Sequence, residues 1–125
     1  MRKKFINKKT LVIGGSVKRE RYSNKAIRKL LDYGHRVESI GLRESKVESV
    51  DILTDKHDMK NIHTITMYIR PSKQEEYYQY ILSLNPSRII FNPGAENQEL
   101  ESIAKEKGIE VVRNCTLILL DYGLF

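Results

Sequence analysis

The hydrophobic and polar positions along this chain follow two alternating patterns. Short runs rich in β-branched and other apolar residues predict buried strands, whereas apolar residues recurring every three or four positions predict amphipathic helices. The strands are predicted at residues 9–14, 36–40, 63–69, 88–91 and 109–112. The helices are predicted at residues 23–33, 72–84 and 97–107. Strands and helices therefore alternate along most of the chain.

Three segments are less regular. Val47–Leu53 predicts one short strand, in which Val50 and Ile52 alternate with charged neighbours. The polar stretch Asp55–Asn61 is expected to be a loop or one helical turn. The closing apolar run Thr116–Leu120 is assigned to neither class.

Local signals place the ends of the helices. Ser23 is a suitable N-cap for the first helix, and Gly34 is suited to the position just after its last turn. Asn85-Pro86 ends the middle helix, and Gly108 ends the last one.

Strands that alternate with helices through short loops predict a parallel sheet covered on both faces. With right-handed crossovers, this is an α/β fold of the Rossmann-like, doubly wound type. It has three layers (α/β/α) and a mainly parallel sheet flanked by helices. Sheets of this type bind ligands at the carboxyl ends of the strands, near the point where the strand order reverses.

The residues that follow the predicted strands are glycines, hydroxyl residues, amides, prolines and cations, with no acid among them. They are Gly14, Gly15 and Ser16; Gly41, Leu42 and Arg43; Arg70, Pro71 and Ser72; and Asn92, Pro93 and Gly94. Glycines let an anion approach the backbone, and the N–H groups at a helix start point toward it. This edge of the sheet therefore predicts an anionic ligand.

The glycine turn does not match the usual dinucleotide fingerprint. Counting from Gly14, the third and sixth glycines of G-x-G-x-x-G are replaced by Ser16 and Arg19. NAD-binding folds also favour an acid near the end of the second strand, where this chain has Arg43. An arginine suits a phosphate on the ribose, which both NADP and coenzyme A (CoA) carry. These residues alone do not separate NADP from CoA.

Composition and charge limit the class of protein. The net charge of +6 comes mostly from residues 1–8, which we interpret as a basic leader, with residues 9–125 as a single domain. Without the five cations among the first nine positions, 17 basic residues face 16 acidic ones, so a body-wide nucleic-acid surface is not expected. The single cysteine and the absence of a long apolar run predict a cytoplasmic protein without a membrane helix.

No constellation for covalent or acid–base catalysis is evident. His35, His57 and His63 are scattered over different predicted elements, without cysteines or paired acids at metal-ligand spacing. The chain has neither a G-x-S-x-G elbow nor a P-loop lysine after the glycine turn. We therefore expect neither a metal site nor catalytic residues, and whether the protein is an enzyme stays open.

Several longer motifs together resemble the small, single-domain CoA-binding proteins, which are similar to the N-terminal domain of the succinyl-CoA synthetase alpha subunit. The resemblance extends over nearly the whole chain beyond the leader. Its motifs are Val12-Ile13-Gly14-Gly15-Ser16, Arg21-Tyr22-Ser23-Asn24, Phe91-Asn92-Pro93-Gly94 and Asn114-Cys115. The second and third motifs together are more specific than the glycine turn alone.

This resemblance implies that the chain binds CoA or an acyl-CoA as a small-molecule ligand. It places Gly14, Gly15 and Ser16 against the cofactor phosphates and Arg43 against a nucleotide phosphate. It adds Tyr22, Ser23, Asn24, Arg70, Pro71, Ser72, Asn92, Pro93, Gly94 and Cys115 to the cofactor-binding residues. Alanine is more usual than Gly15 in that family, and the change is expected to be mild. The synthetase's phosphorylated histidine lies in a domain not found in these residues, so the resemblance implies binding without ligase chemistry.

Individual residues keep alternative interpretations. Arg43 and Arg70 are phosphate ligands or simply polar loop residues, and Asn92 is a ligand contact or a turn former. Cys115 is a small buried hydrophobic residue or the neighbour of the CoA thiol, with which it forms a mixed disulfide. An enzyme that uses NADP or another nucleotide at the same turn is the alternative function. Exposed sheet edges allow a homodimer without requiring one.

Overall fold

The computed structural model describes residues 7–125, which form seven strands, four α-helices and two short 3₁₀ turns. The strands are β1 (Thr10–Gly15), β2 (Val37–Gly41), β3 (Ser45–Val47), β4 (Val50–Leu53), β5 (Thr64–Met67), β6 (Arg88–Phe91) and β7 (Glu110–Arg113). The helices are α1 (Tyr22–Asp32), α2 (Tyr78–Leu84), α3 (Gln98–Glu106) and α4 (Thr116–Asp121). The 3₁₀ turns are η1 (Pro71–Lys73) and η2 (Glu75–Tyr77).

The strands form one sheet in the order β3-β4-β2-β1-β5-β6-β7, and every neighbouring pair except β3–β4 is parallel. The short strand predicted within residues 47–53 is present as β4, but its antiparallel partner β3 was not predicted, so the segment is a hairpin and not a single strand. The chain reverses at Glu48, whose backbone adopts a left-handed conformation with a φ of 54°. Alternating hydrophobicity revealed β4, but the left-handed turn has no glycine to announce it.

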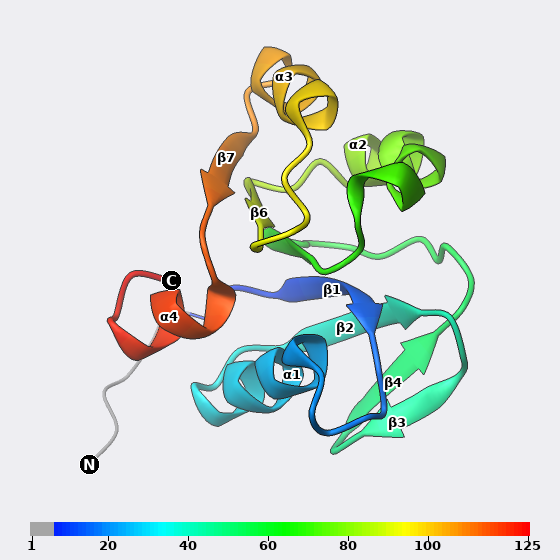
Figure 1. Ribbon diagram of the computed structural model, residues 1–125, viewed down its shortest axis with the longest axis vertical. Coiled ribbons are helices and arrows are strands. Elements are labelled where there is room, and N and C mark those ends of the chain that lie inside the picture. Colours follow the sequence, from blue (N-terminus) through cyan, green and yellow to red (C-terminus); the bar gives the residue numbers. More distant parts are fainter. Residues whose placement is uncertain (1–6) are drawn as a thin grey trace.

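Helices cover both faces of the sheet, which confirms the predicted three-layer, doubly wound Rossmann-like architecture. Helices α1 and α4 pack on one face, where Ile27, Leu30 and Leu119 contact strand residues such as Val12. Helices α2 and α3 lie over the other face (Figure 1). There, Ile81 and Leu100 contribute to the second apolar cluster. The strands at the centre are buried from both sides, as expected for a parallel sheet.

The predicted helix ends are partly confirmed. Gly34 and Gly108 follow α1 and α3 with positive φ values of 86° and 77°, a conformation that glycine adopts without a steric penalty. Ser23, however, is not an N-cap. Arg21 is the extended residue before α1, and Ser23 is buried within the first turn. The helix begins earlier than predicted because the backbone bond from Lys25 N–H already reaches the Arg21 carbonyl.

The predicted helix over residues 72–84 is broken. Its first half consists of η1 and η2, and only Tyr78–Leu84 is α-helical. The fully buried side chain of Gln74 lies between the two 3₁₀ turns and donates to the carbonyls of Ile69 and Ala95. These bonds tie the segment to two loops. The unassigned closing run forms α4, which packs against α1.

Basic residues are also built into the amino-terminal end of the sheet. The Lys8 N–H donates to Nδ1 of His35, and its ammonium donates to the backbone oxygen of Phe125. The buried Arg88 guanidinium donates to Thr64 Oγ1 and to the same Phe125 oxygen, and it stacks on the Phe125 ring at 4.5 Å. Thus Lys8, the last residue of the predicted leader, is bonded into the domain; positions 1–6 of that leader lie outside the described residues. Within residues 7–125, no helix is long and apolar enough to cross a bilayer.

Candidate functional site

The strand order reverses beside β1. Strand β1 pairs with β2 on one side and with β5 on the other, so the chain crosses from one half of the sheet to the other after β4. A cavity of about 580 Å³ lies at the carboxyl ends of these strands. Its walls come from the β1–α1 turn, the start of α1, the β2–β3 turn and the loops that follow β5 and β6. This is the position at which doubly wound sheets bind ligands.

The glycine turn brings the backbone of β1 close to its neighbours. Gly14 has a φ of 100°, and a Cβ atom there would lie 3.0 Å from Ile69 Cγ2. A Cβ atom on Gly15 would lie 2.1 Å from Ser39 Oγ, which is buried and donates to the Val12 carbonyl. The glycine at position 15 therefore also fits the close approach of the second strand, where a Cβ atom would displace the Ser39 hydroxyl. That glycine in place of the family's usual alanine is a mild change stays a prediction.

Side chains of α1 hold the segment after the glycine turn. The buried amide of Asn24 donates to the Ser16 carbonyl at 2.8 Å and accepts from Arg28 Nε at 2.7 Å. Arg28 also donates to the Arg19 carbonyl at 3.2 Å. The Ser16 hydroxyl accepts from the Lys18 N–H at 3.1 Å. Asn24 therefore holds the turn in place through the Ser16 carbonyl and does not line the cavity itself.

Three cationic side chains, those of Lys18, Arg21 and Arg43, line the cavity, and no carboxylate does. All three residues are exposed. Among residues 7–125, the charged groups of these three form no ion pair or hydrogen bond. Their positive potential therefore faces the cavity without an internal counter-charge, which favours an anionic ligand.

The cavity also has apolar walls. Tyr22 at the start of α1 and Leu42 after β2 both line it, and these residues are 66% and 96% exposed. Tyr68 follows β5 and lines the cavity, while its buried hydroxyl lies beside Thr66 and Thr116. Burial raises the pKa of Tyr68, so this hydroxyl stays protonated at neutral pH.

Asn92 joins three elements beneath the cavity. Its amide nitrogen donates to Thr66 Oγ1 and the Met67 carbonyl, and its amide oxygen accepts from the Thr116 N–H at the start of α4. The side chain is 3% exposed, and these bonds occupy both donors and one acceptor position. The geometry fits a residue that fixes the loop after β6 more closely than one that holds a ligand directly.

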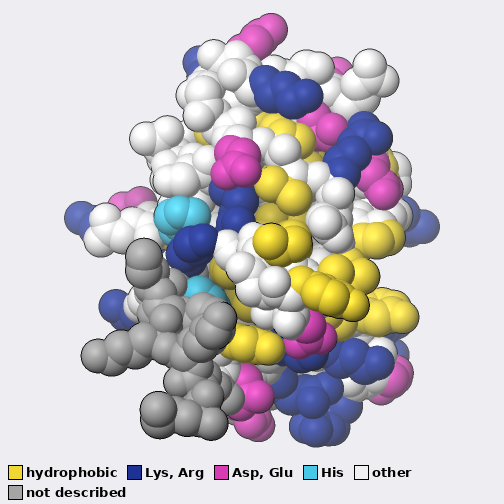
Figure 2. Space-filling model, turned by 90° about the vertical axis from the view of Figure 1, so that its left-hand side faces the viewer, with side chains coloured by type: hydrophobic (Ala, Val, Ile, Leu, Met, Phe, Trp, Pro, Cys, Tyr) yellow, Lys and Arg dark blue, Asp and Glu magenta, His cyan; other side chains and the backbone are white. Residues whose placement is uncertain are grey.

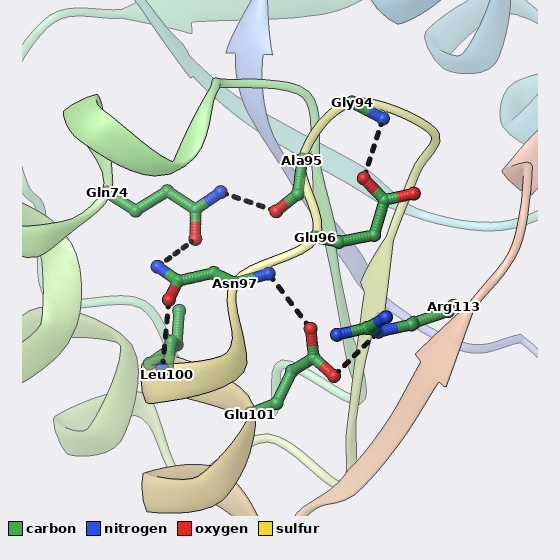
Figure 3. A network of polar contacts seen from close by, with 8 residues as sticks. All are labelled: Gln74, Gly94, Ala95, Glu96, Asn97, Leu100, Glu101 and Arg113. Atoms are coloured by element: carbon green, nitrogen blue, oxygen red, sulfur yellow. Dashed lines mark hydrogen bonds and ion pairs between the residues drawn. The ribbon is translucent and has the colours of Figure 1, made fainter.

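A network of polar side chains supports the same loop from the α2–α3 side (Figure 3). Gln74 donates to the Ala95 carbonyl and accepts from the Asn97 amide at 2.9 Å. Asn97 caps α3 by accepting from the Leu100 N–H, and its own N–H donates to Glu101. The far end of this network reaches β7 through an ion pair between Glu101 and Arg113 at 2.8 Å.

The bonds of this network determine the charge of Glu101. Burial alone would raise the pKa of its carboxyl, but the bonds from Arg113 and the Asn97 backbone lower the pKa below its ordinary value. The ionised Glu101 carboxylate therefore holds the end of the loop that carries Pro93 and Gly94. One of its oxygens accepts from the Asn97 N–H and the other accepts from Arg113 Nε.

The structure brings together half of the residues predicted to bind the ligand. Those that line the cavity are Gly14, Gly15, Ser16, Tyr22, Ser23, Arg43 and Pro93. Those outside the lining are Asn24, Arg70, Pro71, Ser72, Asn92, Gly94 and Cys115. Arg70, Pro71 and Ser72 are exposed at the start of η1, and half-buried Cys115 precedes α4.

Sequence reasoning missed Lys18, Arg21 and Tyr68 as lining residues. Lys18 and Arg21 lie in the segment between β1 and α1, and their closeness in sequence to the glycine turn could have identified them as lining residues. Tyr68 was read only as part of a strand. Within residues 7–125, no three metal-ligating side chains gather at one point.

Comparisons with known proteins identify the class to which this fold and cavity belong. The profile of the CoA binding domain family matches residues 8–121, and the chain belongs to that family. No curated protein matches the chain significantly.

Solved structures share this fold over nearly the whole chain. A protein described only as uncharacterized is 41% identical with a TM-score of 0.94, and the match covers 97% of this chain and all of that one. A protein from Thermus thermophilus designated cell-free ID.343 is 24% identical with a TM-score of 0.82, and the match covers 95% of this chain and 91% of that one. A hypothetical protein from Pyrococcus horikoshii OT3 is 23% identical with a TM-score of 0.83, covering 94% of this chain and 84% of that one. The last two show likeness of fold alone.

Proposed function

We propose that this protein binds CoA or an acyl-CoA in the cavity at the carboxyl end of the sheet, without catalysing a reaction on it. Membership of the CoA binding domain family supports the class of ligand. The non-catalytic role is proposed because the cavity offers positive charge, backbone and apolar surface. The described lining contains no histidine, carboxylate or cysteine to act as base or nucleophile.

The observation that carries this proposal is the set of three unpaired cations around a glycine turn. CoA carries a pyrophosphate and a ribose phosphate, and Lys18, Arg21 and Arg43 are suited to these groups. Gly14 and Gly15 line the cavity with backbone alone, and their lack of a Cβ atom also lets the turn pack against Ile69 and Ser39. The residues present therefore fit the ligand: the turn would receive the pyrophosphate.

Arg43 is the proposed partner of the ribose phosphate. It follows β2 and lines the cavity together with residues from the start of α1. The same position would suit the phosphate of NADP, which is the ligand of the alternative function. Because the family is that of CoA-binding domains, CoA is favoured over NADP.

Calorimetric titration with CoA, dephospho-CoA, acetyl-CoA, NADP and NAD tests the proposal. We expect CoA to bind most tightly and dephospho-CoA to bind roughly ten-fold or more weakly, since a charge-assisted hydrogen bond contributes about 1.5–3 kcal/mol. Arg43→Ala should weaken CoA binding by a similar factor and leave dephospho-CoA binding nearly unchanged.

Arg36→Ala is the matched control. Arg36 precedes β2 as Arg43 follows it, and it is likewise exposed, but it lies at the opposite end of the sheet. Both variants lose the same charge, so only a local contact distinguishes them. If neither CoA, dephospho-CoA nor acetyl-CoA binds in the titration, the proposed function is rejected. Tighter binding of NADP than of CoA would favour the alternative.

Cys115 is proposed to approach the thiol end of the bound CoA. It precedes α4, close to Tyr68 at the inner wall of the cavity. With CoA disulfide as the oxidant, the Cys115 thiolate would attack one sulfur, form a mixed disulfide and release the other CoA as its thiolate. Intact-mass measurement should then show one added CoA that reductant removes. An unmodified wild-type protein, or labelling that persists in Cys115→Ser, would show that Cys115 is only a packing residue.

A further inference from the structure

Strand β7 leaves one edge of the sheet unpaired. The Glu110 N–H donates to the Ser87 carbonyl and the Asn114 N–H donates to the Phe91 carbonyl, so these residues face β6. Because backbone groups alternate along a strand, the N–H and C=O groups of Val111 and Arg113 face outward. Within residues 7–125, the order of the sheet places no further strand beyond β7.

The two edges of the sheet differ in how they are protected. Strand β3 at the other edge has three residues, and the exposed Lys46 lies at its centre. Short strands and lysines are common means of preventing edge-to-edge pairing. Strand β7 has Val111 and Val112 at its centre, and Arg113 is drawn back toward α3 by its ion pair with Glu101. Strand β7 is longer than β3 and carries no lysine, so the β7 edge is the less protected of the two.

An apolar surface continues from this edge onto α4. Figure 2 views the molecule from the side on which β7 and α4 lie in Figure 1, and hydrophobic side chains form a band down this face. On and just after α4, Ile118, Tyr122 and Leu124 are 49%, 74% and 67% exposed. Val112 lies on the same face of the sheet as α4. Strand and helix together thus form one continuous surface.

We propose that two copies of this chain associate through β7 and α4. A twofold axis through Val112 places Val111 opposite the partner's Arg113. Both residues present outward N–H and C=O groups, so each such pair exchanges two hydrogen bonds. An axis through Val111 would be poorer, because the Ile109 N–H is already bonded to the Ala104 carbonyl.

The charges on β7 are compatible with this register. Glu110 lies opposite the partner's Asn114, and Arg113 lies opposite the partner's Val111, so no like charges face each other directly. Val112 meets the partner's Val112 on the side that carries α4. Four-residue strands alone bury too little surface for a stable dimer, so the exposed residues of α4 complete the interface.

The cavity lining includes no residue of β7 or α4. Association and ligand binding can therefore be measured separately, and failure of one leaves the other standing. Sedimentation velocity of the full chain over a wide concentration range is the primary experiment. The wild type should reach the mass of two chains at high concentration.

Val111→Pro tests the strand pairing. Proline removes an N–H that faces outward and has no partner among residues 7–125 of the same copy, so the bonds to β6 survive. We expect this variant to remain a single chain, with its CoA affinity unchanged. Ile118→Lys tests α4 without altering the strand, in case the proline variant does not fold, and should weaken association at least ten-fold. Gln79→Lys, on the exposed side of α2, adds the same charge elsewhere and should associate like the wild type.

Hydrogen exchange distinguishes this interface from any other. The amides of Val111 and Arg113 should become protected only at concentrations at which the two-chain species forms. A wild type that stays a single chain at every concentration would overturn the proposal and leave this surface to a different partner. A dimer that survives both variants, or that leaves these amides unprotected, would also overturn it.

Discussion

The two ends of the sheet carry positive charge in different physical states. At the carboxyl end, Lys18, Arg21 and Arg43 are exposed around a cavity and form no ion pair within residues 7–125. At the amino end, Arg88 is 6% exposed and is bonded to Thr64 and Phe125. Burial lowers the pKa of Arg88, although the guanidinium stays charged.

This difference separates charges that maintain the fold from charges available to a ligand. A buried cation that is bonded into the framework contributes to stability because its removal loses those hydrogen bonds and the packing around it. An exposed cation without partners contributes little to stability and keeps its attraction for an anion. Net charge alone would not have distinguished the two groups.

The largest expected effect is at the amino end. Arg88→Ala removes hydrogen bonds to Thr64 Oγ1 and the Phe125 oxygen, and it leaves space beside the Phe125 ring. We expect the free energy of unfolding to fall by about 2–4 kcal/mol. Urea denaturation measures this, with Arg36→Ala as the control. A loss below about 0.5 kcal/mol would show that the amino-end charges are as dispensable as exposed ones.

Gly15→Ala tests whether part of the carboxyl end is also structural. The added methyl group would collide with the buried Ser39 hydroxyl, so we expect a loss of about 1–3 kcal/mol in the free energy of unfolding. Ser39→Ala removes the obstacle, and the double variant should be more stable than the sum of the single effects predicts. Strict additivity in this cycle would contradict a steric cause.

The pH dependence of stability should reflect the amino end. Burial and the positive charges of Lys8 and Arg88 lower the pKa of His35 and His63 from the ordinary value of 6.5. The unfolded chain then binds protons more readily than the folded one, so stability falls as pH drops below about 6.5. Denaturation at mildly acidic and neutral pH should show this fall, and the variant His35→Gln/His63→Gln should reduce it. If the double variant loses as much stability at mildly acidic pH as the wild type, the loss comes from titratable groups other than these two histidines.

The smallest effect on stability is expected from the cavity cations. Lys18→Ala and Arg43→Ala should each change the free energy of unfolding by less than about 0.5 kcal/mol, because neither charged group has a partner among residues 7–125. Calorimetric unfolding without ligand measures this. A loss above about 1 kcal/mol in either variant would mean that these charges also maintain the fold.

Most of the fold could be predicted from local patterns. Period-two and helical periodicities located six of the seven described strands and most of the helices, and Gly34 and Gly108 marked helix ends. The hairpin of β3 and β4 was missed because Glu48, and not a glycine, adopts the left-handed conformation. The break in the helix over 72–84 was missed because its cause is the long-range bonding of Gln74 to Ala95.

The candidate site was predicted in outline from the residues at strand ends. The glycine turn and Arg43 were recognised because strand topology alone places them at one edge. Lys18, Arg21 and Tyr68 were missed because their place in the cavity depends on the path of the chain after each strand. The role of Asn24 and Asn92 in holding the loops around the cavity could not be predicted either, because their hydrogen-bond partners lie in other elements.

The sequence by itself determined the alternation of most strands and helices, the glycine turn, and the positive edge of the sheet that suits an anionic ligand. These follow from local periodicity and from the chemistry of a few residues after each strand. Only the tertiary structure decided which cations are buried in the framework and which remain free around the cavity. The physical reason is that desolvation and pairing arise from contacts between distant segments. No local pattern assigns Arg88 to a structural role and Arg43 to an unpaired one.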